Sequence, residues 1–428
     1  MGIAGIFRAT AFLAPPLAII APLSTAPLLA LATLGVIGLW IWDRRALPRM
    51  PRTPLLIVAA FLIWGAISLL WTTAPGYGLF AVARLSFMLL GGVALAAIAA
   101  RLPASDRRRT GRALIAGVLA ALLILALNVY LSGIANRTLA LAFDLPAYEP
   151  YHMNRPATLV AIFLWPAALA VATTVGAELS AALMIAGLAI IAGSESATAA
   201  IAVLAGSMAL AGVIAGAAVA VRRAVAFLLV AALLAGPLYV HGPALTSKAA
   251  VASMLPSSLH HRIYIWRFAA EKIREKPVVG WGLEASRSIP GGDVAQPIPL
   301  RGEDGSVRLD RLRMALLPLH PHNAGLQIWL ELGIAGVVLL ASLILCLIRS
   351  IGRRSPPRAA AAFCLGQIVC VFLIAQSSYG IWQSWWLSAI VLGAAFSIAL
   401  LPRDPDPADD GARLLQPEGP AAPPTSRR

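Results

Sequence analysis

The fold of this chain is decided at His320-Pro321-His322-Asn323, which is followed by Ala324-Gly325-Leu326-Gln327-Ile328-Trp329-Leu330-Glu331-Leu332-Gly333-Ile334-Ala335-Gly336. A long polar segment ends here and a hydrophobic run begins. Pro321 suits the first turn of a helix, where a backbone N–H is not needed. The run that follows is long enough to cross the hydrocarbon core of a bilayer. The stretch therefore predicts a histidine at the mouth of a membrane helix.

Below that histidine the predicted helix carries a polar stripe. Asn323, Gln327 and Glu331 recur every four residues, so they share one face, which should point away from lipid. Gly333 and Gly336 are expected to admit a neighbouring helix at close range. The pattern indicates a functional site at a membrane surface, centred on His322. The supporting residues that we expect are His320, Asn323, Gln327 and Glu331.

The composition agrees with a membrane protein. Of the 428 residues, 59% are hydrophobic and only 12% are charged, which leaves too little polar surface for a soluble protein of this length. The apolar runs are continuous and do not alternate with polar residues, so they indicate helices and not a β-barrel. We therefore expect an all-α polytopic integral membrane protein. Cys346, Cys364 and Cys370 fall in or beside apolar runs and are interpreted as small core residues.

The net charge of +15 could suggest a nucleic-acid partner, but the basic residues gather in short loops between the runs. That distribution is typical of the cytoplasmic side of a membrane protein. We therefore expect membrane lipid, and no nucleic acid, as a partner. The first apolar run continues past Thr25, which favours a retained membrane anchor over a cleaved signal peptide.

Hydropathy predicts about twelve transmembrane helices. Their ranges are 3–20, 24–42, 54–71, 79–100, 113–132, 156–174, 177–192, 197–220, 224–240, 324–348, 359–377 and 383–401. Every arginine-dense short loop then falls on one side, so both termini should be cytoplasmic. We divide the chain into helices 1–9 over 1–240, a large periplasmic loop with short helices and the donor and acceptor site over 241–322, helices 10–12 over 323–401, and a disordered cytoplasmic tail over 402–428.

A helix is predicted within the outer segment at 257–276. Its apolar stripe includes Ile263, Trp266 and Ile273. One interpretation is an interfacial brace whose basic residues touch lipid headgroups. The other is that one or two arginines hold a diphosphate through paired N–H donors. Arg262 and Trp266 lie one turn apart in this helix.

Other polar residues have competing interpretations. Glu195 is either a solvated turn residue or an ionisable group acting at membrane depth. Arg84 lies near the outer end of its span and can reach the interface from there. His320 and His322 form a His-x-His pair that could bind a metal together with His260 and His261, but Cys or carboxylate partners at ligand spacing are missing, so we favour a metal-free site. No phosphate-binding loop of the Walker type occurs, so ATP is not expected to drive the protein.

Taken together, these features resemble a known superfamily. His322-Asn323, nine residues, Gly333, two residues and Gly336 are similar to the signature of the O-antigen ligase / Wzy-C superfamily of bacterial membrane glycosyltransferases. The upstream segments Arg262-Ile-Tyr-Ile-Trp266 and Pro277-Val-Val-Gly280-Trp-Gly282 are similar to the outer-loop lead-in of that family. Outside 260–336 the likeness lies only in the hydropathy.

The resemblance implies a reaction at the periplasmic face of the bacterial inner membrane. An undecaprenyl-diphosphate-linked glycan is the donor, and lipid A-core is the first-choice acceptor. A hydroxyl of the acceptor attacks, and neither a metal nor a cofactor is used. His322 would act as general base or orient the acceptor, and Arg262 would hold the diphosphate. A histidine at a helix N-terminus is biased toward the neutral imidazole, which can accept a proton.

One departure from the family pattern concerns the second phosphate-binding arginine. Many members carry an arginine after a serine at the junction that here reads Gly193-Ser194-Glu195-Ser196-Ala197-Thr198. This chain has none there, so either Arg155 or another loop arginine takes that role. Three alternatives to the ligase stay open: a polysaccharide polymerase, a protein O-oligosaccharyltransferase and, from another class, a transporter or flippase. The transporter should show polar residues deep in several spans and repeat symmetry, which the sequence lacks.

Overall fold

The computed structural model describes most of the chain. The described residues are 2–43, 50–143, 153–194, 196–241, 257–297, 300–301, 307–308, 313–353 and 357–401. The predicted tail at 402–428 lies outside them.

The described residues are mainly helical, as the sequence predicted. The helices are α1 (Ile3–Ile20), η1 (Pro22–Ser24), α2 (Thr25–Trp42), α3 (Arg52–Ile67), η2 (Ser68–Leu70), α4 (Pro75–Ala99), α5 (Ala104–Tyr130), α6 (Ile134–Phe143), α7 (Asn154–Thr174), α8 (Ala177–Gly193), α9 (Ala197–Gly212), η4 (Val213–Ala217), α10 (Ala218–Leu234), η5 (Gly236–His241), α13 (Ser257–Glu275), η6 (Ala285–Arg287), α14 (Ala324–Arg353), α15 (Arg358–Ala375) and α16 (Ser384–Leu400).

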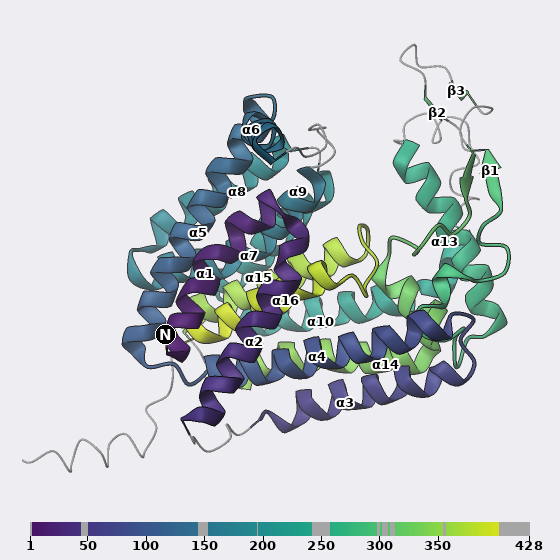
Figure 1. The fold of residues 1–428 in the computed structure, drawn as a ribbon, viewed down its shortest axis with the longest axis horizontal. Helices are drawn as coiled ribbons and strands as arrows, with labels where there is room; N and C mark the ends of the chain where they lie inside the picture. Colours follow the sequence, from purple (N-terminus) through teal and green to yellow (C-terminus); the bar gives the residue numbers. More distant parts are fainter. Residues whose placement is uncertain are drawn as a thin grey trace, which may run out of the picture.

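Four short strands accompany α13 in the loop that precedes α14. They are β1 (Ala295–Pro297), β2 (Leu300–Arg301), β3 (Val307–Arg308) and β4 (Arg313–Ala315). β1 pairs with β4, and β2 pairs with β3, both antiparallel. α13 and these strands gather at one end of the molecule (Figure 1). The described part of the large loop thus contains a helix and paired strands, and the helix lies within one residue of the predicted range.

The number of membrane helices agrees with the prediction from hydropathy. Among the described residues, nine helical stretches are long and apolar enough to cross a membrane. One of them, Ala197–Leu234, consists of α9 and α10, which are joined through η4. Counting these two separately and adding the shorter apolar helices α8 and α16 gives twelve. The protein is an all-α polytopic membrane protein.

Two boundaries differ from the sequence prediction. The turn between α9 and α10 falls at η4, where Gly216 adopts φ 101°, and not at Arg222-Arg223, which lie inside α10. Glycine tolerates this conformation and arginine does not, which moves the turn upstream. Similarly, Arg107 through Arg112 belong to the first turns of α5 and not to a loop. Hydropathy placed the α9–α10 boundary and the start of α5 too far along the chain, because charged side chains lower the mean hydropathy of the residues around them.

The helices form two groups that meet at α15 and α16. α3, α4, α10 and α14 run beside one another, while α1, α5, α7 and α8 pack together on the other side (Figure 1). α7 is the most buried of the long apolar helices, because 83% of the residues in its most apolar 18-residue stretch are buried. Its Trp165 fills the space above Gly206 of α9 and Gly366 of α15, where any β-carbon would overlap the indole ring. Small residues thus let these helices approach closely, as is usual in membranes.

Candidate active site

The helix that carries the histidine motif is broken at Gly333, which has a left-handed backbone (φ 63°, ψ −163°). The break frees carbonyl groups of the preceding turn, and the loop after α13 supplies their donors. Trp281 N–H donates to Leu330 O at 2.8 Å, and Gly282 N–H donates to Glu331 O at 2.7 Å. The loop is therefore joined to the membrane helix through backbone hydrogen bonds.

Gly333 and Gly336 do not act as predicted. A β-carbon at Gly333 would overlap the carbonyl group of Val278, so the close neighbour is the loop and not another helix. The nearest atoms around Gly336 belong to Leu332 and Ile328 of its own helix. The expectation of a helix contact at these glycines was wrong, because the spacing alone does not reveal a left-handed residue.

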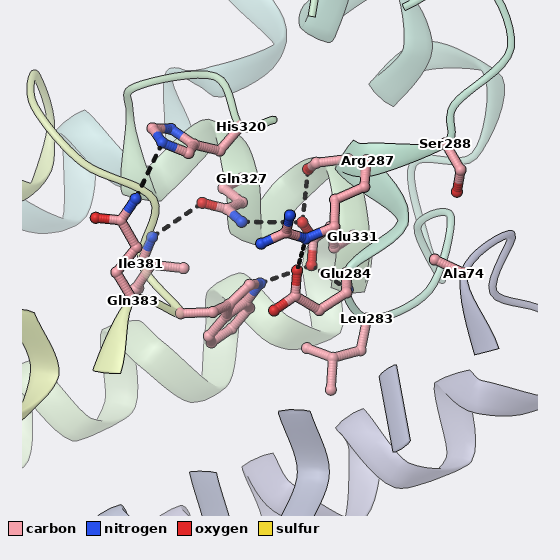
Figure 2. Close-up of polar contacts among 12 residues, drawn as sticks. Ala74, Leu283, Glu284, Arg287, Ser288, His320, Gln327, Glu331, Ile381 and Gln383 are labelled. Carbon is pink, nitrogen blue, oxygen red and sulfur yellow. Dashed lines mark hydrogen bonds and ion pairs between the residues drawn. The ribbon is translucent and has the colours of Figure 1, made fainter. Parts of the chain in front are cut away.

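Glu331 is fully buried and accepts four hydrogen bonds from three separate segments (Figure 2). Its Oε2 receives the N–H of Glu284 at 2.6 Å and the indole N–H of Trp382 at 2.7 Å. Its Oε1 receives the hydroxyl of Ser286 at 2.5 Å and the amide of Gln327 at 3.0 Å. Each donor compensates part of the cost of burying the carboxylate. Glu331 thus fixes α14 against both the 282–287 turn and the 376–383 turn.

Gln327 extends this network toward the histidine. Its side-chain oxygen accepts the N–H of Ile381 at 2.9 Å (Figure 2). The same turn presents the carbonyl oxygen of Ser378, which lies 2.7 Å from Nδ1 of His322. The predicted polar stripe of α14 therefore faces protein and not lipid, and it positions the segment that binds His322.

The start of α14 differs from the prediction in one respect. The helix begins at Ala324, and Asn323 caps it by accepting the N–H of Leu326 on Oδ1 at 2.9 Å. Pro321 therefore precedes the cap and is not part of the first turn. Its carbonyl oxygen accepts the indole N–H of Trp266 at 2.9 Å, which ties α13 to the histidine motif. Trp266 is thus a structural support of this stretch.

His322 has a backbone conformation that is uncommon for a non-glycine residue, with φ 53°. Its backbone N–H donates to Nδ1 of His320 at 3.2 Å, and the two rings lie 4.3 Å apart between centroids. A carbonyl oxygen can only accept, so the contact with Ser378 places the proton of the neutral imidazole on Nδ1. Nε2 is then left with a lone pair that can accept a proton.

Both imidazoles of the motif are held neutral. Burial lowers the pKa of His322 below its ordinary value of 6.5; the hydrogen bond to Ser378 raises it, and the charge of Arg262 lowers it. Burial also lowers the pKa of His320, to about 3, with smaller contributions from His322 and Arg287. The neutral state was predicted from the helix N-terminus, whereas the structure attributes it mainly to burial.

Arg262 and Arg155 come from different parts of the chain and both lie near Tyr379. The charges of both arginines lower the pKa of the Tyr379 hydroxyl, although burial raises it overall. The guanidinium of Arg155 lies 5.7 Å from the centre of the Trp385 ring, and Trp385 in turn packs 4.7 Å from Tyr379. Arg262 also acts on His322, as described above. The structure therefore brings both predicted arginines to the side of the site where Tyr379 lies.

A pocket of about 460 Å³ opens beside Arg155. Asn136, Asn154 and Tyr379 also line it, together with apolar residues of α1 and η1. None of its described lining residues is acidic. A site of this composition suits an anion, because guanidinium and amide groups donate hydrogen bonds to phosphate oxygens.

A second pocket, of about 340 Å³, lies on the His320 side. Glu284 forms ion pairs there with Arg84 at 3.2 Å and with Arg287 at 2.7 Å. Arg84 also donates to the carbonyl oxygen of Trp382 at 3.0 Å. Arg84 therefore pairs within the protein and does not reach out to the membrane interface as the sequence suggested.

Two sequence hypotheses are left without a test. Glu195 lies outside the described residues. Across the described ranges, no group of three or more His, Cys, Asp or Glu side chains is close enough to hold a metal ion. The side chain of His260 is not among those described, so the metal-free site stays a prediction.

Several site residues were not predicted. Ser378, Tyr379 and Gln383 lie between the last two helices, in a turn that resembles any polar loop in the sequence. Arg287 was only one of several loop arginines. The nearby run of Trp382, Trp385 and Trp386 gave no distinguishing signal, because tryptophan is common where membrane helices meet the interface.

The fold and the site define a class: a multi-pass helical membrane protein with a histidine and arginine site where a folded loop meets its helices. The Wzy_C family model, described as O-antigen ligase, matches residues 181–341. That range includes Arg262, His322 and Glu331 but not Arg155 or Tyr379. The resemblance predicted from the sequence is confirmed.

Curated relatives agree with this match over part of the chain. Proteins named "Putative polysaccharide ligase" from Rickettsia conorii and Rickettsia prowazekii are 39% and 40% identical to it, each over 132 residues. One from Rickettsia felis is 38% identical over 134 residues. The aligned stretch covers 31%, 30% and 31% of this chain and 29%, 29% and 30% of these relatives. The chain thus spans less than a third of their length.

Proposed function

We propose that this protein is a glycosyltransferase that moves a glycan from undecaprenyl diphosphate to a hydroxyl of lipid A-core. The reaction takes place on the periplasmic face of the bacterial inner membrane. The family match and the names of the relatives support a ligase of this kind. The site contributes a base, two arginines and two pockets, and the proposal uses no metal or cofactor.

The observation that carries the proposal is the fixed tautomer of His322. Because Nδ1–H is bound to Ser378 O, Nε2 is free to accept the proton of an acceptor hydroxyl. As the acceptor oxygen bonds to the anomeric carbon, the bond from that carbon to the diphosphate oxygen breaks. The lipid diphosphate leaves with the electron pair, and the hydroxyl proton moves to Nε2.

Arg262 and Arg155 are proposed to hold the diphosphate. Negative charge grows on the leaving group as its bond to the sugar breaks, and fixed guanidinium groups stabilise that charge. The pocket beside Arg155 has no acidic residue among its described lining, which supports this use. A forked guanidinium can contact two phosphate oxygens at once, which a lysine ammonium cannot.

The test is glycolipid analysis of a deletion strain complemented with wild type, His322→Ala or His322→Asn. The asparagine amide can still donate to Ser378 O but has no basic nitrogen, so it separates chemistry from structure. We expect both variants to insert normally and to leave lipopolysaccharide without long glycan, while the lipid-linked polymer accumulates.

Other results would identify other functions. Full transfer by His322→Asn would remove the proposed base. Lipopolysaccharide capped with single units in the variants would indicate the polymerase, and loss of glycan from a protein would indicate the protein transferase. Loss of the lipid-linked glycan from the outer leaflet would indicate the flippase.

A further inference from the structure

The pocket on the His320 side has no role in the donor chemistry described above. It lies between the start of α2, Arg84 of α4, the 282–287 turn and the 380–385 turn. Arg84, Glu284, Arg287, His320, Gln383 and Trp385 contribute the polar and aromatic part of its lining. Figure 2 shows Glu284 and Arg287 on one side of this region and His320 and Gln383 on the other.

Hydrogen-bonding capacity in this pocket is not used up. Within the described part of the chain, Nε of Arg84 and Oε1 of Gln383 are buried and have no partner. Glu284 has one bond to each carboxylate oxygen, which leaves acceptor positions free. Buried polar groups without partners are rare and call for a ligand or water. Residues that line the pocket therefore carry one donor and two kinds of acceptor whose hydrogen-bonding capacity is not filled within the protein.

The charged groups of the pocket are already paired with one another, because Glu284 forms ion pairs with both Arg84 and Arg287. Glu284 contributes a carboxylate to the lining, whereas the pocket beside Arg155 has no acidic side chain among its described residues. A doubly negative group would have to compete with that carboxylate for the two arginines. A saccharide suits the same groups, because each of its hydroxyls can donate to a carboxylate and accept from a guanidinium. The wall formed by Trp385 adds an aromatic surface.

The two pockets are adjacent to the same histidine. His320 lines this pocket, and its ring lies 4.3 Å from that of His322. Tyr379 lines the other pocket and directly follows Ser378, which binds His322. Trp385 lines the first pocket, and its ring is contacted by Arg155 of the second. A molecule in each pocket would therefore approach His322 from a different side.

We propose that the Arg84–Glu284–Arg287 pocket binds the terminal saccharide of the acceptor and presents its attacking hydroxyl to Nε2 of His322. The inference rests on the proposed function, since it assigns the second substrate of that reaction. The acceptor saccharide is the core oligosaccharide of lipopolysaccharide. Arg287 and Gln383 are its recognition residues, and neither takes part in holding the donor.

The test measures equilibrium binding to the full-length protein in detergent, without turnover. The probes are core oligosaccharide released from the cell's own lipopolysaccharide and undecaprenyl diphosphate. Arg287→Gln and Gln383→Ala should each weaken oligosaccharide binding about tenfold, the scale of one lost hydrogen bond. Both should bind undecaprenyl diphosphate as wild type does, which also shows that they are folded.

The matched control is Arg155→Gln, which should weaken undecaprenyl diphosphate binding and leave oligosaccharide binding intact. The proposal is overturned if wild type does not bind the oligosaccharide, if Arg287→Gln and Gln383→Ala bind it normally, or if they lose the lipid diphosphate instead. Failure of the proposed function looks different: the oligosaccharide binds with the expected dependence on Arg287, yet wild type transfers no glycan.

Discussion

At the scale of single residues, His322 combines an uncommon backbone conformation with a defined proton position. Its φ of 53° aims the ring at Ser378, and the carbonyl group there fixes the tautomer. Strained conformations of this kind persist only where surrounding contacts enforce them, and they gather at functional sites. The neighbours that enforce it here are His320 and the turn at 376–383.

The pH dependence of transfer should follow the lowered pKa of His322. Only the neutral ring can accept a proton, so the rate falls as pH drops through that pKa. Because burial and the charges of Arg262 and His261 lower it, the acidic limb of the kcat/KM profile, which reports the free enzyme, should lie below pH 6.5. Steady-state rates from pH 4 to 8 would check this.

Arg262→Gln serves as the comparison for that profile. Removing the nearby positive charge should move the acidic limb toward higher pH, whatever happens to the absolute rate. A limb that stays in place in this variant, or one that lies above pH 6.5 in wild type, would contradict the assignment of His322 as the base.

Some residues of the site could be predicted from the sequence because they belong to one local pattern of residue types and spacing. His322, Arg262 and the polar stripe of α14 all lie within residues 262–331, whose spacing is informative. Tyr379, Arg84 and Gln383 come from other elements, and their nearness depends on how those elements pack. Arg155 was chosen as a substitute for a missing arginine, and the structure brings it to Tyr379.

At the scale of elements, the broken helix α14 decides how the loop is attached. The helix is interrupted at Gly333, and the loop after α13 occupies the break. Trp64 of α3 adds a hydrogen bond to Leu332 O at 2.9 Å, so a third element contributes to the same junction. Hydropathy located the helix correctly but could not reveal the break. The backbone conformation of a single glycine does not change the mean hydropathy of the run.

Gly333→Ala should therefore destabilise the protein. The conformation of Gly333 (φ 63°, ψ −163°) is essentially restricted to glycine and costs another residue about 1–3 kcal/mol, and the added carbon would also overlap the carbonyl group of Val278. We expect a lower melting temperature in detergent and reduced transfer. Gly38→Ala in α2 is the matched control, since a β-carbon there meets no atom within 4 Å. Equal stability of both variants would show that the break is not required.

At the scale of the whole molecule, both pockets are lined by residues of the turn between α15 and α16, and Ser378 of the same turn binds His322. The twelve apolar helices could be predicted because length and composition suffice for a membrane span. Their division into two groups could not, since it depends on close contacts such as Trp165 against Gly206 and Gly366.

The proposed orientation can be tested by labelling introduced cysteines. Val294→Cys lies on the loop and Trp42→Cys at the far end of α2, and the native side chains are 51% and 83% exposed. In cells with a permeabilised outer membrane, an impermeant maleimide should label the first position, and the second only after lysis. Wild type, whose three cysteines lie in α14 and α15, provides the blank. The reverse pattern would place the site in the cytosol and remove the proposed reaction.

The four bonds that converge on Glu331 have a practical consequence for protein engineering. Since this carboxylate joins the loop to the membrane helices, the loop cannot be replaced by a foreign loop on its own. A chimera that imports a foreign loop must also import its partners on α14 and in the turn before α16. New substrate preferences are therefore more accessible through single side chains inside the pockets than through transplanted loops.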